Sequence, residues 1–265
     1  MNNEEKDKEK EQEQELVREE RMNPLNDYLF MKYMGEKGDE EQLISLLNAI
    51  LQKTGMTEIV WVEIREDKTY TAEFVGDKSG VLDVRAKLAD GTMVNIEVQV
   101  RDVSNMDRRS LFYWSREYFK GIRSGQPYEE LPNVVAINIL GQEYLTIDEI
   151  HASFHLWEDV HKDFRLTDAL ELHFIDMVKF RRLKNKDIYN NVLHRWLTFF
   201  DKTADEATIK KILEMDQAIR KAQKVISTVR SDREMFRTYQ MRELALADFN
   251  SSVYSADKRG EKRGI

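Results

Sequence analysis

The chain has 265 residues, with 41 Lys and Arg against 49 Asp and Glu, a formal net charge of −8 and no cysteine. The absence of cysteine excludes disulfide scaffolds, cysteine zinc sites and thiolate nucleophiles. No apolar run approaches the length of a bilayer span and the first residues lack the apolar core of a signal peptide, so we expect a soluble cytoplasmic protein with no membrane partner. A net charge of −8 also argues against a protein that coats nucleic acid through bulk charge.

The negative charge is unevenly distributed along the chain. Residues 1–21 carry 9 acidic and 5 basic side chains, a net charge of −4, so the other 244 residues carry the remaining −4. Glycine and proline are absent between Gln142 and Arg259, which predicts mixed α/β structure in the first half and long helices in the second.

These signals divide the chain into four expected parts. They are a disordered charged tail (1–22), an α/β core (23–150), an accessory strand pair and helix packed on the core (151–204), and a helical C-terminal region (205–265). The C-terminal helices are candidates for a homo-oligomer interface. The segment KRGEKRG (258–264) starts a period-four charged repeat that stops abruptly, so we expect the chain to be truncated there.

The first elements follow from turn signals and hydrophobic periodicity. Residues 23–27 (NPLND) are a turn and helix start, residues 39–52 carry apolar side chains at helical spacing, and residues 57–65 have the composition of a strand. Residues 80–101 (GVLDVRAKLADGTMVNIEVQVR) are two alternating segments around Asp90-Gly91, which predicts a β-hairpin.

The alternation also predicts the register of this hairpin. A two-residue loop would pair Asp83 with Val98 and mix polar with apolar faces. A three-residue loop over 89–91, with its glycine in the left-handed region, pairs Val84 with Ile96 and keeps the apolar face uniform. We therefore expect the three-residue loop.

This register brings polar side chains together on the other face. Asp83 lies opposite Glu97, with Gln99 beside them, and two close carboxylates repel each other unless a cation lies between them. A hard divalent cation such as Mg²⁺ would meet this need. A solvated polar face is the other interpretation, and periodicity alone leaves both open. Arg85 and Lys87 could neutralise the pair, but they lie further along the strand toward the turn.

A crossover unit is expected after the hairpin. Ser104 begins a helix, with Asp107 as a capping-box variant, and the helix runs to about Ser124 with Gly125 as its cap. A strand over 133–140 then lies parallel to the second hairpin strand. Most aromatic side chains of this helix are expected to pack in the core, and Tyr113 is kept as a site candidate because it faces away from the apolar stripe.

The later elements are expected to be a strand pair (154–160 and 170–177), a helix (187–200) and one long helix or helical hairpin (205–248). The five histidines form no metal-binding spacing and are expected to be structural or exposed.

Two segments, 179–195 and 217–242, each carry a net charge of +5. They could follow a phosphate backbone or form a solvated helix face, and the residues leave both open.

The order helix-strand-strand-strand-helix-strand, with Asp83 on one strand and Glu97-Val98-Gln99 on the next, resembles the PD-(D/E)XK nuclease superfamily. The segments NPLNDYLF (23–30) and NIEVQV (95–100) and the following Arg109 and YWS (113–115) are similar to its recombination-promoting nuclease and transposase-like branch. The resemblance covers residues 24–140 and extends more weakly to the helix at Trp196.

The resemblance implies a Mg²⁺-dependent DNA endonuclease with an αβββαβ core and a mixed sheet. Asp83 and Glu97 would bind the metal, with the Val98 carbonyl as a third ligand. Gln99 stands where the superfamily usually has a lysine, so it could orient water but supplies no positive charge.

Other residues have roles only by resemblance. Arg101, Arg108 or Arg109 could supply the missing positive charge, and Asp27 is either an outer metal ligand or a helix cap. The activity would serve recombination, transposition or related DNA processing. The alternative is a catalytically weak or inactive module of the same fold that binds DNA or another partner.

Overall fold

The computed structural model describes residues 21–65, 84–100 and 104–263. Among them, a mixed six-stranded sheet has the order β1-β2-β3-β4-β6-β5. The elements are α2 (Asp27–Met34), α3 (Glu41–Leu51), η1 (Gln52–Thr54), β1 (Val62–Ile64), β2 (Val84–Leu88), β3 (Met93–Gln99), α5 (Met106–Lys120), η2 (Tyr128–Glu130), β4 (Val134–Leu140), β5 (His151–Phe154), β6 (Leu170–Asp176), α6 (Met177–Arg182), α7 (Val192–Phe200), α8 (Glu206–Met215), α9 (Gln217–Ser231) and α10 (Arg233–Arg263).

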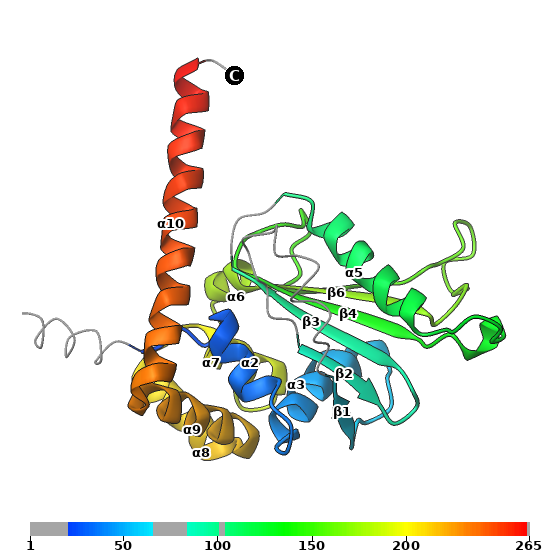
Figure 1. Ribbon diagram of the computed structural model, residues 1–265, viewed down its shortest axis with the longest axis horizontal. Helices are drawn as coiled ribbons and strands as arrows, with labels where there is room; N and C mark the ends of the chain where they lie inside the picture. Colours follow the sequence, from blue (N-terminus) through cyan, green and yellow to red (C-terminus); the bar gives the residue numbers. More distant parts are fainter. Residues whose placement is uncertain (1–20, 66–83, 101–103, 264–265) are drawn as a thin grey trace, which may run out of the picture.

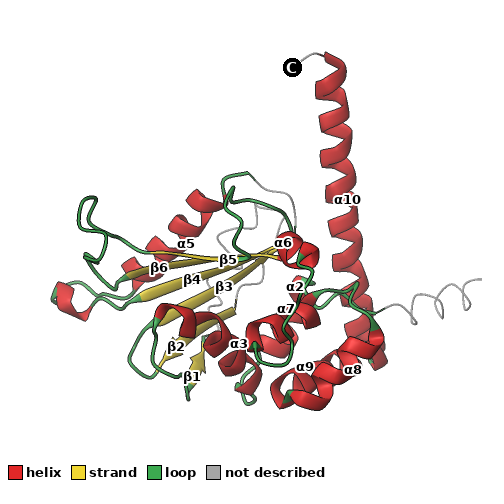
Figure 2. Cartoon of the chain, turned by 180° about the vertical axis from the view of Figure 1, so that it is seen from behind, coloured by secondary structure: helices red, strands yellow, loops and turns green. Residues whose placement is uncertain are grey.

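The sheet separates two helical layers. Helix α5 covers one face, and α2, α3 and α7 lie on the other, with α8 and α9 outside them (Figures 1 and 2). The larger apolar core lies on the α2/α3/α7 side and includes alternate residues of β4, such as Val135 and Ile137. The smaller core lies under α5 and includes Met106 and Leu140. The α/β fold with a helical C-terminal part is therefore confirmed.

The hairpin has the predicted register wherever the structure describes it. Val84 pairs with Ile96, the Leu88 amide donates to the Thr92 carbonyl at 2.8 Å, and Gly91 has φ +92°. Strand β4 runs parallel to β3, as a crossover through α5 requires. Asp83 lies outside the described residues.

Helix α5 differs from its prediction at both ends and on its surface. It is capped by Asn105 rather than Ser104, without a side-chain capping bond, and it is followed by Gly121. A Cβ at Gly121 would lie 2.2 Å from Pro132 Cδ, so this close approach needs glycine. The expected cap, Gly125, forms a separate left-handed turn with φ +88°.

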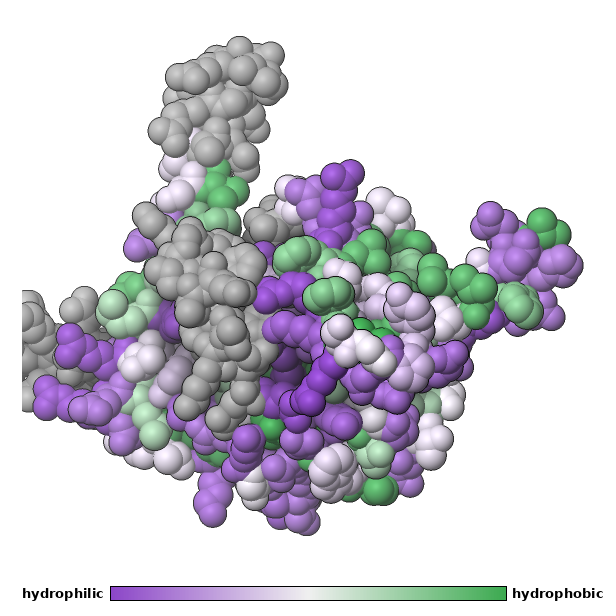
Figure 3. Space-filling model, turned by 45° about the vertical axis from the view of Figure 1, so that its right-hand side comes forward, coloured by the Kyte–Doolittle hydropathy of each residue, from purple (hydrophilic) through white to green (hydrophobic). Residues whose placement is uncertain are grey.

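Most aromatic side chains of α5 were expected to pack in the core, and this prediction is wrong for Phe112 and Phe119. Phe112 is 50% exposed and Phe119 is 79% exposed. Figure 3 shows apolar side chains gathered on the surface over this helix. The reason is that the sheet face under α5 carries polar side chains. The buried Ser110 hydroxyl accepts a hydrogen bond from Asn138 there, which replaces part of the apolar packing.

The C-terminal region is neither one helix nor a hairpin, because aspartates divide it into three helices. Asp216 accepts hydrogen bonds from the Ala218 and Ile219 amides and starts α9. Asp232 ends α9, and its carboxylate accepts from two amides of the first turn of α10. Asn191 caps α7 in the same way, so that helix begins later than expected.

Strand β5 lies earlier in the chain than the expected 154–160. It pairs antiparallel with β6, while Trp157 forms an isolated bridge with Arg165 in the connection. Arg21 and Met22, expected in the tail, already contact the body: the Arg21 guanidinium donates to the Asp201 and Phe199 carbonyls. Within the described ranges, no helix is both long and apolar enough to span a membrane.

Three of the five histidines meet in a buried cluster at the β5–β6 edge. His151 Nε2 lies 2.8 Å from His173 Nδ1, and His173 Nε2 lies 2.7 Å from Glu171 Oε1. The Thr54 hydroxyl donates to the same carboxylate at 2.6 Å, and His155 Nε2 lies 3.4 Å from its other oxygen. These histidines are structural, as expected, but their convergence was not predicted.

The cluster lowers the pKa values of both His151 and Glu171. Burial, and then electrostatic interactions with His173 and Lys53, lower the pKa of His151 to about 3. Burial alone would raise the pKa of Glu171, but the hydrogen bonds from His173 and Thr54 outweigh it and lower that pKa to about 2. The folded chain therefore keeps His151 neutral and Glu171 ionised.

We predict that stability falls as the pH falls below the unfolded pKa of His151, 6.5. The unfolded chain then binds a proton that the folded chain does not, which costs about 2 kcal/mol of unfolding free energy by pH 5. Urea unfolding at pH 7 and pH 5 checks this: His151→Phe should reduce the difference by about that amount. His161→Gln, an exposed control, should leave it unchanged. Equal pH dependence in wild type and His151→Phe would contradict the prediction.

Candidate active site

The polar residues of β3 lie on the face of the sheet that α5 covers. The apolar Val94, Ile96 and Val98 belong to the core on the opposite side. Because side chains alternate along a strand, Glu97 and Gln99 point toward α5. Glu97 is 1% exposed and Gln99 is 4% exposed, so the interpretation as a solvated face is wrong for these two residues.

One oxygen of the Glu97 carboxylate is paired and the other is not. Arg109 Nε, from the first turns of α5, lies 2.6 Å from Glu97 Oε1. Oε2 is buried, and within the described part of the chain no donor reaches it. Burial raises the pKa of Glu97, and the Arg109 charge and hydrogen bond oppose this increase. The carboxylate is thus held in place with one lone-pair side available for a cation.

The start of α5 positions Arg109. Asn105 has φ +78°, which is the only left-handed conformation of a non-glycine residue within the described ranges, and asparagine tolerates it better than most residues. Its carbonyl accepts the Arg109 amide at 3.0 Å. Met106 is fully buried, and the Tyr144 hydroxyl accepts the Asp107 amide and donates to the Asp107 carboxylate. This anchoring places Arg109 over Glu97.

One further contact supports Arg109 within α5, and another holds the helix in register on the sheet. The guanidinium carbon of Arg109 lies 5.2 Å from the ring centroid of Tyr113, the predicted site candidate. At Ser110, which directly follows Arg109, the Asn138 amide on β4 donates to the hydroxyl at 2.8 Å, and this amide also donates to the His173 carbonyl at 2.9 Å. The Ser110–Asn138 contact was not predicted from the sequence, although Asn138 is the one polar residue among residues 134–140.

The remaining predicted residues are less closely grouped. Asp83 and Arg101 lie outside the described residues, and Arg108 is exposed. The α2 cap is Asn26, whereas Asp27 lies at the first helical position. The Asp27 carboxylate contacts Arg242 Nη1 at 3.5 Å and accepts the Tyr28 amide at 2.7 Å.

The donor chemistry fits a hard cation but is incomplete in the described residues. There, no three His, Cys, Asp or Glu side chains come together around one metal position. The unpaired, buried Oε2 of Glu97 is an oxygen donor of the kind that Mg²⁺ prefers. A metal bound at Glu97 would need a second carboxylate from outside the described residues, and Asp83 is the candidate from the sequence.

The two basic segments have mainly structural contacts. Arg181 pairs with Asp201 at 3.2 Å, and Arg195 pairs with Asp216 at 3.0 Å. In the second segment, Lys221 lies 2.6 Å from Glu41. These side chains join the C-terminal helices to the body, so the positive charge of both segments is partly compensated.

Comparison with known families gives an independent assignment. A family model described as PD-(D/E)XK nuclease family transposase matches residues 24–256. Comparison with the curated proteins and with the solved structures gave no match. The match includes both the core and most of the C-terminal helices, and it indicates a nuclease- or transposase-related role. The chain therefore belongs to the PD-(D/E)XK nuclease family transposases, as the resemblance in its sequence predicted.

Proposed function

We propose that this protein is a metal-dependent DNA endonuclease that hydrolyses phosphodiester bonds in recombination, transposition or related DNA processing. The observation that carries this proposal is the Glu97 carboxylate. It is buried in the middle of the sheet, fixed by Arg109 through one oxygen, and unpartnered in the described residues at the other. A buried charge with an unpaired oxygen is costly unless a cation completes it.

The metal ligands in this proposal are Asp83, Glu97 and the Val98 carbonyl. Asp83 directly precedes Val84 in the chain, and Val84 pairs with Ile96, the neighbour of Glu97, which supports this assignment. A bound Mg²⁺ would supply an activated water and stabilise the leaving oxygen of the phosphodiester. Every ligand is an oxygen, which suits a hard divalent cation.

The chain's own residues supply positioning and charge. Gln99 shares the face of Glu97 and can orient the attacking water through its amide, but it cannot act as a base. Arg109 supplies the positive charge that a lysine would bring in the general motif. Because a guanidinium stays protonated, its role is to stabilise phosphate charge and hold Glu97, with Tyr113 supporting its plane.

A second candidate function is a non-catalytic module that binds DNA through the same fold. Gln99 in place of a lysine favours it, since the water then lacks one activating charge. The C-terminal helices remain the candidate homo-oligomer contact in either case. The two functions differ in a single measurable property, which is divalent-dependent cleavage.

We predict that purified wild-type protein nicks or linearises plasmid DNA in the presence of Mg²⁺ or Mn²⁺. Asp83→Ala and Glu97→Ala should reduce the cleavage rate by at least about 100-fold, because each removes a metal ligand. Glu63→Ala, which removes an exposed carboxylate from β1, is the matched control and should cut as wild type does. Intact plasmid with every divalent ion tested, or undiminished cutting by the Ala variants, would refute the endonuclease.

We also predict that divalent cations stabilise the wild-type fold without DNA. Binding to the folded chain raises the melting temperature as the ion concentration exceeds the Kd. Glu97→Gln keeps the shape of the side chain but removes its charge. The melting temperature of this variant should therefore not respond to about 10 mM Mg²⁺ or Ca²⁺. A shift as large as that of wild type would place the ion elsewhere.

A further inference from the structure

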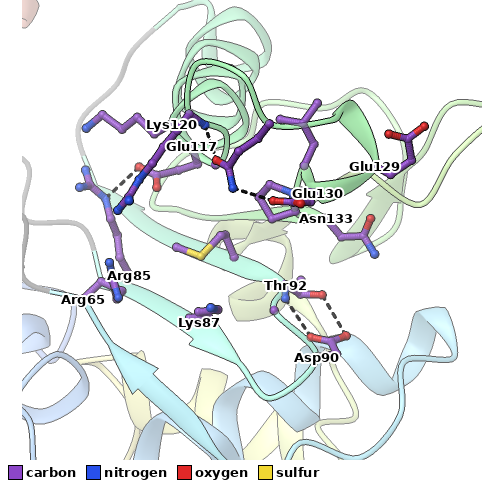
Figure 4. A pocket seen from close by; sticks show the side chains of 17 residues that line it. Arg65, Arg85, Lys87, Asp90, Thr92, Glu117, Lys120, Glu129, Glu130 and Asn133 are labelled. Atoms are coloured by element: carbon purple, nitrogen blue, oxygen red, sulfur yellow. Dashed lines mark hydrogen bonds and ion pairs between the residues drawn. The ribbon is translucent and has the colours of Figure 1, made fainter.

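A polar groove lies on the same side of the sheet as Glu97, at the other end of α5. Its volume is about 900 Å³, and its walls are the β2–β3 hairpin, the C-terminal end of α5 and the segment around η2 (Figure 4). The basic side chains that line it come from separate elements: Arg65, Arg85, Lys87, Lys120 and Arg123. A lining this polar does not suit an apolar small molecule.

The groove continues the polar face of the candidate active site. Arg85 and Lys87 alternate onto the α5 side of β2, and Arg85 pairs with Asn95 on β3. Glu97 lies two residues further along β3, about 7 Å away at the usual rise of a strand. Since a DNA strand carries one phosphate for about 3.4 Å of helix axis, a strand crossing the site would reach the groove within a few nucleotides.

The acidic residues of the groove either have partners of their own or lie across the groove from the basic side chains of the hairpin. The Asp90 carboxylate accepts the Thr92 amide at 2.9 Å and the Thr92 hydroxyl at 3.0 Å. Glu117 lies beside Arg85, with an N···O distance of 3.4 Å. In Figure 4, Arg65, Arg85 and Lys87 lie on one side, and Glu129 and Glu130 lie on the opposite side.

Exposed cations are available on both walls. Lys87, on the hairpin, and Arg123, after α5, are both exposed. Glu130, which also lines the groove, accepts a hydrogen bond of 2.6 Å from Gln126. The groove therefore presents positive charge both from the hairpin and from the segment after α5.

We propose that this groove binds the phosphates of the DNA strand that flank the scissile phosphodiester. The proposal rests on the function proposed above, and it names the path of the substrate beyond the metal site. Lys87 and Arg123 contact phosphates from opposite walls. Phosphate contacts fix the position of the strand without reading its sequence, so the groove contributes affinity and register.

The test compares two double variants with equal changes in charge. Lys87→Gln/Arg123→Gln removes the groove cations, and Lys184→Gln/Lys224→Gln removes one exposed lysine from each of the two basic segments. Binding of fluorescent single- and double-stranded oligonucleotides is measured by anisotropy in Ca²⁺ at several salt concentrations. Both pairs are exposed, so urea midpoints should equal that of wild type.

The groove variant should bind at least about 10-fold more weakly, and its slope of log K against log salt should be smaller by about 1.8 for duplex or about 1.4 for a single strand. The duplex and single-strand arms identify which form of DNA follows the groove. Unchanged affinity and slope, or an equal loss in the control variant, would overturn the proposal.

Failure of the groove can be distinguished from failure of the endonuclease. Binding is measured without cleavage, so a groove variant that loses affinity supports the groove even if wild type never cuts. Conversely, cleavage that depends on Glu97 but is unaffected by the groove variant would keep the endonuclease and remove the groove.

Discussion

Burial of the Glu97 carboxylate in the centre of the sheet is the constraint on which the neighbouring structure depends. Removing a carboxylate from water costs several kcal/mol unless hydrogen bonds and opposite charge offset the loss. Arg109 supplies this compensation at 2.6 Å, and it can do so only because Asn105, Met106 and the Tyr144 hydroxyl start α5 at one position. The polar underside of the helix is thus a consequence of one acidic residue.

The same constraint explains why the surface of α5 was poorly predicted. Hydrophobic periodicity assumes that a crossover helix turns its largest apolar side chains toward the sheet. Here the sheet presents Glu97, Gln99 and Asn138, so α5 buries Met106 and Ser110, while Phe119 remains exposed. Sequence patterns show the amphipathicity of each element, but they do not show which face of the partner an element meets.

Elements specified by local chemistry were predicted more accurately. The hairpin register follows from alternation and a glycine that adopts φ +92°, so the pairing of Val84 with Ile96 is confirmed. Residues 205–248 contain no glycine or proline, and a pattern based on those two residue types does not reveal Asp216 and Asp232 as caps. The polar face with Glu97 and Gln99 was also predictable, whereas its burial depended on the distant placement of α5.

The Ser110–Asn138 hydrogen bond has a consequence for the precision of this region. Apolar contacts are non-directional, so a helix held by them alone can slide by a fraction of an ångström at little cost. A hydrogen bond weakens steeply with misalignment, and this one lies next to Arg109 in the chain. Replacing both Ser110 and Asn138 by apolar residues of similar shape would therefore leave the fold stable but allow the Arg109 guanidinium to shift. The stability of the protein and the position of this cation can thus be changed separately.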